Sequence, residues 1–149
     1  MALSIAQYLP LPTTTHYCTM KQAFLITLLW SSSDDEGEPL DREYSISDID
    51  DPDNAIDRVL CQFKSMVEAD PVLINLENIV ELTGNDYDRI AHDLCLTINC
   101  HGAGFWDGDY SPDRIGSGII GDRLTAISHY FTKIGLYANS RDRLSIEQY

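Results

Sequence analysis

The stretch that decides the fold is DYDRIAHDLCLTINCHGAGFWDGDY, residues 86–110, because the spacing of its apolar residues changes part-way along. Asn85 or Asp86 can cap a helix here, since short polar side chains accept hydrogen bonds from the first free backbone N–H groups of a helix. The apolar positions that follow share one helical side: Tyr87, Ile90, Ala91 and Leu94. The first half of the stretch therefore predicts a helix.

The second half of the stretch has a different pattern. CLTINC (95–100) is rich in residues that favour strands, and NCHGAGFW (99–106) is typical of a strand, a tight turn and a second strand. Gly102 and Gly104 can adopt the positive φ angles that hairpin turns often need. We therefore predict a helix followed by a β-hairpin.

Helical spacing also precedes this stretch. Asp51-Pro52 and Asp70-Pro71 each predict a helix start, with Asp as the cap and Pro at the first helical position. The first of these helices should end at residues 68–69. Its apolar positions are Ile56, Val59, Leu60, Phe63 and Val67, and those of the second, which Gly84 should close, are Val72, Leu76, Ile79 and Val80.

The two ends of the chain complete the expected elements. MKQAFLITLLW (20–30) is nearly all apolar and predicts a buried helix, with a buried strand as the alternative. Near the C-terminus, LYAN (136–139) and RLSIEQY (143–149) predict a hairpin with its turn at residues 140–142. Before this hairpin we expect a last helix that ends at Gly135 and has apolar positions at Leu124, Ile127, Phe131 and Ile134.

Together these elements predict an α+β fold, with about four to five helices packed on a small antiparallel β-sheet. We expect a single domain over residues 20–149 and a loose N-terminal extension over residues 1–19. Gly37 and Pro39 interrupt any helix between them, so residues 33–53 should form an acidic surface loop, with a short turn near 44–49.

The charge of the chain bears most directly on function. There are 24 acidic and 10 basic residues, a net charge of −14 and an isoelectric point of about 4.3, and most of the excess lies before residue 94. Such a field repels nucleic acid and anionic lipid, and it attracts basic protein surfaces. The alternative is that the acidity serves solubility alone.

Other features bear on the compartment. The four cysteines accompany no secretory signal, so we expect reduced thiols in a cytosol-like compartment. No run of about 18 apolar residues is present to cross a bilayer.

The sequence offers two candidate metal sites. The first is a zinc site, H-x2-C-x4-C-H, made by His92, Cys95, Cys100 and His101, but this spacing matches no common zinc module. The second is a calcium loop with oxygen ligands at Asp107, Asp109, Ser111 and Asp113. It has Pro112 where an EF-hand has glycine and Gly118 where it has the closing glutamate, so a solvated turn is the better interpretation. We expect no metal ion and no cofactor.

No catalytic signature stands out. Cys100 and His101 are adjacent, but thiol–imidazole pairs meet through the fold and not by adjacency in sequence. Asp107 and Asp109 could share a proton, although paired surface aspartates seldom do. We therefore expect no catalytic residues. Of the neighbouring aromatic residues Phe105 and Trp106, we expect one to pack inward and the other to cover an edge or anchor a partner.

Three segments carry a resemblance: LLWSSSDDEGEPLDREYSISDI (28–49), AHDLCLTINCHGAGFWDGDY (91–110) and GDRLTAISHYF (121–131). In these segments the chain resembles a family of small acidic proteins of bacteriophages and mobile elements that share an HGAGFWD core and have no assigned activity. The likeness extends from about Phe24 to Tyr137. Cys95 and Cys100 stand where that pattern has tryptophan and glycine, which weakens the zinc hypothesis. The resemblance implies an accessory role in the cytoplasm of a bacterial host.

The primary hypothesis is a non-enzymatic acidic protein that binds a basic surface of a host or phage nucleic-acid-binding protein. It would act as a DNA mimic in counter-defence, of the anti-restriction or anti-CRISPR kind. Neutralising Asp34, Asp35, Asp50 and Asp51 together should reduce binding and leave the fold intact. The expected partner-binding residues are Asp34, Asp35, Glu36, Glu38, Asp48, Asp50, Asp51, Asp53, Trp106, Asp107 and Asp109, and helical Asp57, Asp86, Asp88 and Asp93 could extend them.

The alternative hypothesis is a small enzyme or metal-dependent module built on the loop that contains His101, Asp107 and Asp109. It predicts that these three side chains converge beside a cleft.

Overall fold

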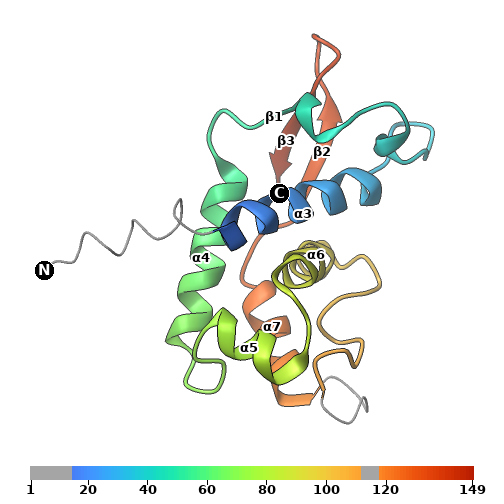
Figure 1. The fold of residues 1–149 in the computed structure, drawn as a ribbon. Coiled ribbons are helices and arrows are strands. Elements are labelled where there is room, and N and C mark those ends of the chain that lie inside the picture. The colour runs from blue at the N-terminus through green and yellow to red at the C-terminus, as the bar shows by residue number, and fades with distance from the viewer. Residues whose placement is uncertain (1–14, 112–117) are drawn as a thin grey trace, which may run out of the picture.

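A central helix, α3 (Thr15–Ser31), lies between a small sheet and the remaining helices (Figure 1). The computed structural model describes residues 15–111 and 118–149. Within them the fold is α+β, as predicted. Its other helices are α4 (Ala55–Ala69), α5 (Leu76–Thr83), α6 (Tyr87–Ile98) and α7 (Gly118–Ser128), and its strands are β1 (Ile49–Asp50), β2 (Ile134–Ala138) and β3 (Leu144–Gln148).

The buried helix predicted for the apolar segment at 20–30 is confirmed. Phe24 and Leu28, one helical turn apart, are completely buried in α3, which packs on α6 and on β2. The helix already begins at Thr15, inside the range expected to be a loose extension. Residues 1–14 of that extension lie outside the described residues.

The closing hairpin is also confirmed. β2 and β3 are antiparallel, with Ile134 opposite Gln148 and Ala138 opposite Leu144. The sheet is mixed and not purely antiparallel, because the two-residue strand β1 pairs with β3 in parallel. The predicted last helix was too long: α7 ends at Ser128, and Ile134 enters the core from β2. Ile134 lies at helical spacing from Leu124 in the sequence although it belongs to a strand, because both side chains are apolar and fill the same core.

The predicted hairpin at 95–106 is wrong. Residues 95–98 belong to α6, and residues 99–111 form an irregular loop. Burial of Leu96, Thr97 and Ile98 on the helix outweighs the strand preference of these residue types. Gly102 and Gly104 do have positive φ, 97° and 156°, but within the loop. The side chain of Asn99 accepts a hydrogen bond from the Ile134 backbone N–H at 2.9 Å, which joins the end of α6 to β2.

The helix caps follow the predicted chemistry with shifted starts. The Asp51 carboxylate accepts hydrogen bonds from the N–H groups of Ala55 and Ile56 at 2.7 and 3.1 Å, yet α4 begins at Ala55 and not at Pro52. Asn54 intervenes in the left-handed region, with φ of 54°. Asp70 behaves similarly, since α5 begins only at Leu76, after a turn and the cap residue Asn75.

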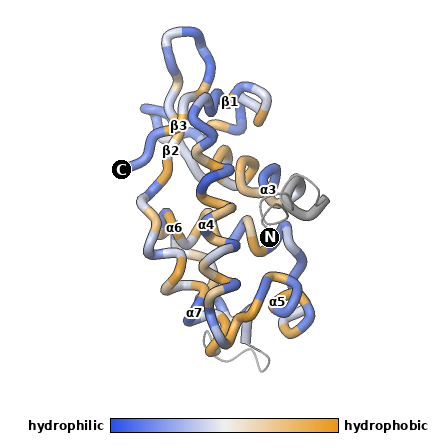
Figure 2. Tube along the Cα trace, turned by 90° about the vertical axis from the view of Figure 1, so that its left-hand side faces the viewer, coloured by the Kyte–Doolittle hydropathy of each residue, from blue (hydrophilic) through white to orange (hydrophobic). Residues whose placement is uncertain are grey.

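The core lies where helical spacing placed it. Along α4, polar and apolar residues alternate with helical spacing (Figure 2), and each predicted apolar position is buried: Ile56, Val59, Leu60, Phe63 and Val67. Complete burial of one such side chain contributes about 1.5–3 kcal/mol. The α4 end at Ala69 and the α5 end before Gly84 also match the prediction, and Gly84 has the left-handed φ of 77°.

Candidate functional site

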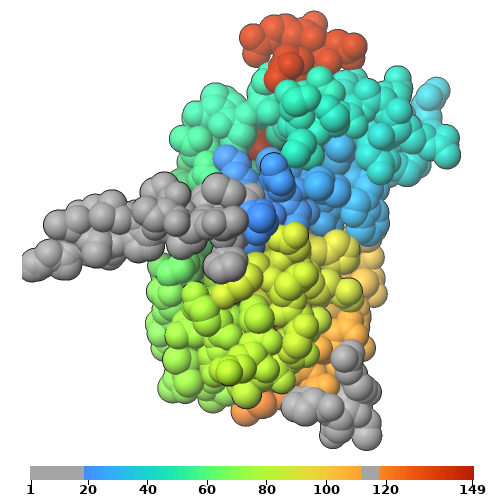
Figure 3. Space-filling view, in the orientation of Figure 1, coloured from blue at the N-terminus to red at the C-terminus, as the bar shows by residue number. Residues whose placement is uncertain are grey.

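Residues 33–53, called the acidic segment from here on, form a continuous part of the surface. They cross the molecule between the end of α3 and the start of α4, beside the β2–β3 hairpin (Figure 3). Two short 3-10 helices, Leu40–Arg42 and Ile46–Asp48, shape the segment, and the second falls at the predicted turn. Leu40 is only 5% exposed, so it anchors the segment to the core.

Two predicted partner-binding acids instead stabilise turns inside the acidic segment. Asp34 Oδ1 accepts hydrogen bonds from the backbone N–H groups of Glu36 and Glu38 at 2.8 and 2.9 Å. Asp48 accepts one from the N–H of Ser45 at 2.8 Å, in a capping box. These bonds give the segment a defined backbone conformation.

Two further acids connect the segment to the rest of the fold. Asp50 Oδ1 accepts a hydrogen bond from Arg143 Nε at 2.8 Å, while Arg141 Nη2 lies 3.8 Å from its other oxygen. Asp51 caps α4. Asp34, Asp50 and Asp51 thus accept hydrogen bonds from backbone N–H groups or an arginine, which argues against the expectation that neutralising them together with Asp35 leaves the fold intact.

The remaining predicted acids of the segment are exposed on the surface. Asp35, Glu36 and Asp53 are exposed, and within residues 15–111 and 118–149 their carboxylates have no hydrogen bond or ion pair. Glu38 forms only a surface ion pair with Arg42, at 2.8 Å. Surface pairs of this kind contribute little to stability.

Most basic side chains of the described residues are already paired with acids. Few basic side chains therefore remain to neutralise the other carboxylates, and these carry the excess negative charge. The paired cations are Lys21, Arg42, Lys64, Arg89, Arg123, Arg141 and Arg143.

The loop that contains HGAGFWDGDY is anchored by its aromatic residues. Phe105 is completely buried, stacked on Phe63 with ring centroids 6.2 Å apart and in edge-to-face contact with Tyr110 at 5.1 Å. Trp106 is half-buried. Phe105 confirms the expectation that one of the neighbouring aromatics packs inward. That Trp106 covers an edge or anchors a partner stays a prediction.

The loop residues of the enzyme alternative make separate contacts. The exposed His101 lies against Trp30, with ring centroids 5.7 Å apart. Asp107 accepts a hydrogen bond from the backbone N–H of Gly104 at 3.2 Å, and Asp109 pairs with Arg89 at 2.8 Å. Both aspartates therefore have roles within the loop. The fourth ligand of the calcium hypothesis, Asp113, lies outside the described residues.

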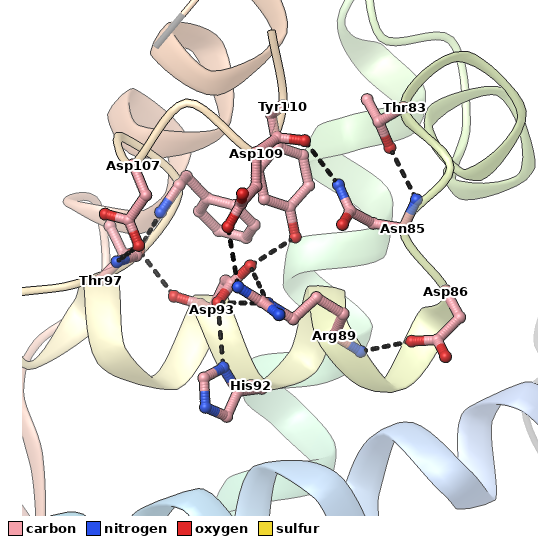
Figure 4. Close-up of polar contacts among 12 residues, drawn as sticks. Thr83, Asn85, Asp86, Arg89, His92, Asp93, Thr97, Asp107, Asp109 and Tyr110 are labelled. Carbon is pink, nitrogen blue, oxygen red and sulfur yellow. Dashed lines mark hydrogen bonds and ion pairs between the residues drawn. The ribbon is translucent and has the colours of Figure 1, made fainter. Parts of the chain in front are cut away.

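A buried carboxylate that the sequence patterns did not identify fixes the loop on α6. Asp93 is 1% exposed and accepts a hydrogen bond from the Tyr110 hydroxyl at 2.7 Å (Figure 4). Arg89 Nε lies 3.1 and 3.3 Å from its two oxygens, and His92 Nδ1 lies 2.9 Å from Oδ1. Asp93 cannot extend an acidic surface, which corrects that expectation. An Arg four residues before an Asp inside an apolar helical pattern was the available signal.

Electrostatics follow from this burial. Desolvation, followed by the charge of Asp93, raises the pKa of Tyr110 far above its usual value, so the phenol stays a hydrogen-bond donor. The charges of Asp93 and Asp109 outweigh desolvation and raise the pKa of Arg89. Tyr110 therefore stays a neutral phenol and Arg89 stays a charged guanidinium.

The residues of the zinc hypothesis lie in unlike surroundings. Cys95 is completely buried, and desolvation raises the pKa of its thiol strongly, whereas Cys100 is exposed in the loop. His92 is engaged with Asp93. Among the residues that the structure describes, no group of three or more His, Cys, Asp or Glu is arranged to hold a metal ion.

Comparisons with known proteins add no relative: no family model matches the chain, and no curated protein or solved structure matches it. In the described part of the chain, none of the helices combines the length and the apolar character needed to cross a membrane.

Proposed function

We propose that this protein is an acidic accessory protein of a phage or mobile element, which binds a basic surface on a nucleic-acid-binding protein in the host cytoplasm. One observation carries the proposal. The acidic segment is ordered by its own contacts, and it presents Asp35, Glu36 and Asp53 to solvent without partners among the described residues. The net charge of −14 gives the field that attracts such a surface.

Order in the segment matters for affinity. A disordered acidic tail must lose conformational freedom when it binds, and that loss weakens association. Here Asp34, Asp48 and Asp50 have already fixed the backbone that carries the free carboxylates. Duplex DNA presents one negative charge per about 1.7 Å of axis, so a protein that imitates it gains from carboxylates held at fixed positions.

The proposed biological role is counter-defence, of the anti-restriction or anti-CRISPR kind. The carboxylates would occupy the groove in which a defence enzyme holds nucleic acid. The resemblance of residues 28–49, 91–110 and 121–131 to small acidic phage proteins favours this setting over an acidity that serves solubility alone.

The test is affinity capture from host or phage-infected lysate with two variants of equal charge change. The first, D35N/E36Q/D53N, removes the free carboxylates of the acidic segment. The second, E77Q/E81Q/D122N, removes exposed carboxylates from α5 and α7, at the opposite end of the molecule (Figure 1). The proposal expects the first variant to lose a captured nucleic-acid-binding protein and the second to retain it. Equal retention by both variants would refute the assignment to the acidic segment.

A further inference from the structure

A shallow groove of about 430 Å³ runs between α3 and α6, on a surface distinct from the acidic segment. Ile26 and Trp30, one turn apart on α3, contribute its apolar side, and Asp86, Asp88 and His92 contribute its α6 side. Ile26 is 51% exposed and Trp30 is 36% exposed. The inward face of α3 at Phe24 and Leu28 is completely buried in the core, whereas Ile26 and Trp30 on its outer face remain partly exposed.

The Trp30 ring is held in place before any partner binds. The His92 ring lies 6.0 Å from it at an interplanar angle of 33°, and the His101 ring lies 5.7 Å from it at 80°. His92 is itself fixed by the buried Asp93 carboxylate. A large aromatic surface that is already immobilised gives contact area with little further loss of side-chain freedom on binding.

The groove is negative in spite of the arginine on its wall. Asp86 and Asp88 are exposed. Arg89 also lines the groove, but its guanidinium is engaged by Asp93 at 3.1 Å and by Asp109 at 2.8 Å. The charge of Arg89 is therefore compensated, and although Asp86 accepts a hydrogen bond from the Arg89 backbone N–H at 2.8 Å, its charge and that of Asp88 make the groove attractive to a cation.

From this combination we infer that the groove binds an arginine side chain on a basic segment of the partner protein. The aliphatic part of the arginine packs on Ile26, its planar guanidinium stacks on the Trp30 indole, and Asp88 supplies the opposite charge. Lysine fits less well, because its compact ammonium group cannot stack as a plane. The inference rests on the proposed function, since it names a second contact with the same basic partner.

The inference is tested with a defined probe, a capped peptide of alanine and glycine that carries three arginines, beside versions in which citrulline or lysine replaces arginine. Binding is followed by NMR on the two indole N–H signals, which Trp30→Phe assigns. The arginine peptide should shift the Trp30 signal and leave the Trp106 signal in place. The citrulline peptide should not bind, and the lysine peptide should bind more weakly.

Matched variants locate the contact. Ile26→Ser and Asp88→Asn should each weaken the arginine peptide about twofold to fivefold, the range expected for an exposed cation–π and charge contact. Leu82→Ser, at an exposed apolar position on α5, and Asp35→Asn, in the acidic segment, should leave its affinity unchanged. If the Trp30 signal does not shift, or if Asp88→Asn and Asp35→Asn lose equal affinity, the inference that the groove binds arginine is wrong. Neither result bears on the proposed role of the acidic segment.

Two outcomes separate the groove from its alternatives. If the protein is a dimer that Ile26→Ser dissociates, and the arginine peptide does not bind, the groove is a contact between two copies and the inference is wrong. If the peptide binds as expected while D35N/E36Q/D53N still captures the same lysate protein as the wild type, the proposed function fails and the arginine groove stands.

Discussion

The hydroxyl of Tyr110 donates a hydrogen bond of 2.7 Å to a carboxylate oxygen of Asp93, and both side chains are buried. This contact joins the far end of the 99–111 loop to the middle of α6. Thr97, one turn after Asp93, holds the same loop from the other side, because its hydroxyl oxygen accepts a hydrogen bond from the Phe105 N–H at 3.1 Å. The HGAGFWDGDY stretch is therefore a structural loop built on α6.

The Tyr110–Asp93 contact predicts a stability difference between two tyrosines. Tyr110→Phe should lower the free energy of unfolding by about 1–3 kcal/mol, because a buried carboxylate loses a donor. Tyr44→Phe makes the same chemical change at the surface, where the hydroxyl donates to Asp142 at 2.8 Å, and should cost much less. Urea denaturation of both variants measures the difference. Equal losses of unfolding free energy in the two variants would show that the buried Tyr110–Asp93 hydrogen bond stabilises the fold no more than the surface one.

Close packing at Gly104 predicts a second effect. A Cβ atom at this position would clash with Thr97 Oγ1, because the two atoms would lie closer than van der Waals contact allows. The Thr97 hydroxyl cannot easily move away, since it accepts a hydrogen bond from the Phe105 N–H and donates one to the Asp93 carbonyl. Gly104→Ala should therefore cost about 1–3 kcal/mol of stability. Gly102→Ala is the control: its φ is also positive, at 97°, but a Cβ there meets no atom within 4 Å, so it should cost less. Thermal unfolding of the two variants makes the comparison.

Asp70 predicts a pH dependence of stability. Burial opposes its ionisation, but hydrogen bonds from the Val72 and Leu73 N–H groups and from Arg123 outweigh burial and lower its pKa. A lowered folded-state pKa stabilises the fold above the unfolded-state value, and this contribution is lost as pH falls through the folded-state pKa. Asp70→Asn should therefore destabilise the protein at pH 7, and the loss should shrink as the pH falls below the unfolded-state pKa and through the lower folded-state pKa.

Denaturation of wild type and Asp70→Asn across this pH range checks the prediction. Glu81→Gln, at an exposed carboxylate on α5, serves as the control and should give a small difference at every pH. A stability gap for Asp70→Asn that stays constant as the pH falls through the acid range in which carboxylates become protonated would contradict the assigned role of the carboxylate charge.

The acidic segment predicts unequal roles for two neighbouring aspartates. Asp51→Ala should cost about 1 kcal/mol of stability, because the first N–H groups of α4 lose their cap. Asp53→Ala should change stability by no more than about 0.5 kcal/mol, because its exposed carboxylate has no partner among the described residues. If the two variants unfold alike, the division between structural and available carboxylates is wrong.

Local sequence patterns correctly predicted the helices and strands whose formation depends mainly on their own residues. Phe63 and Val67 lie on the buried face of α4 because helical spacing alone places them there. Gly84 ends α5 because it takes the left-handed conformation without a Cβ penalty. The β2–β3 hairpin follows from two short strand patterns separated by polar turn residues.

Tertiary contacts decided the rest. Cys95–Ile98 joined α6 because burial outweighed strand preference, and Ile134 looked helical because a strand and a helix share one core. The sequence also could not separate the structural acids from the exposed ones, because nothing in the local sequence distinguishes Asp34, Asp50 and Asp51 from Asp35 and Asp53. Only the folded backbone shows which carboxylates have N–H or guanidinium partners.

Salt dependence of partner binding tests the central claim most directly. The captured partner is titrated with wild type, D35N/E36Q/D53N and E77Q/E81Q/D122N over a series of sodium chloride concentrations. If the acidic segment binds a basic surface, Kd rises steeply with salt for wild type, because screening weakens exposed charge pairs. The slope should be smaller for D35N/E36Q/D53N and unchanged for E77Q/E81Q/D122N. A Kd that stays constant with salt, or a slope that is the same in all three proteins, would contradict the account.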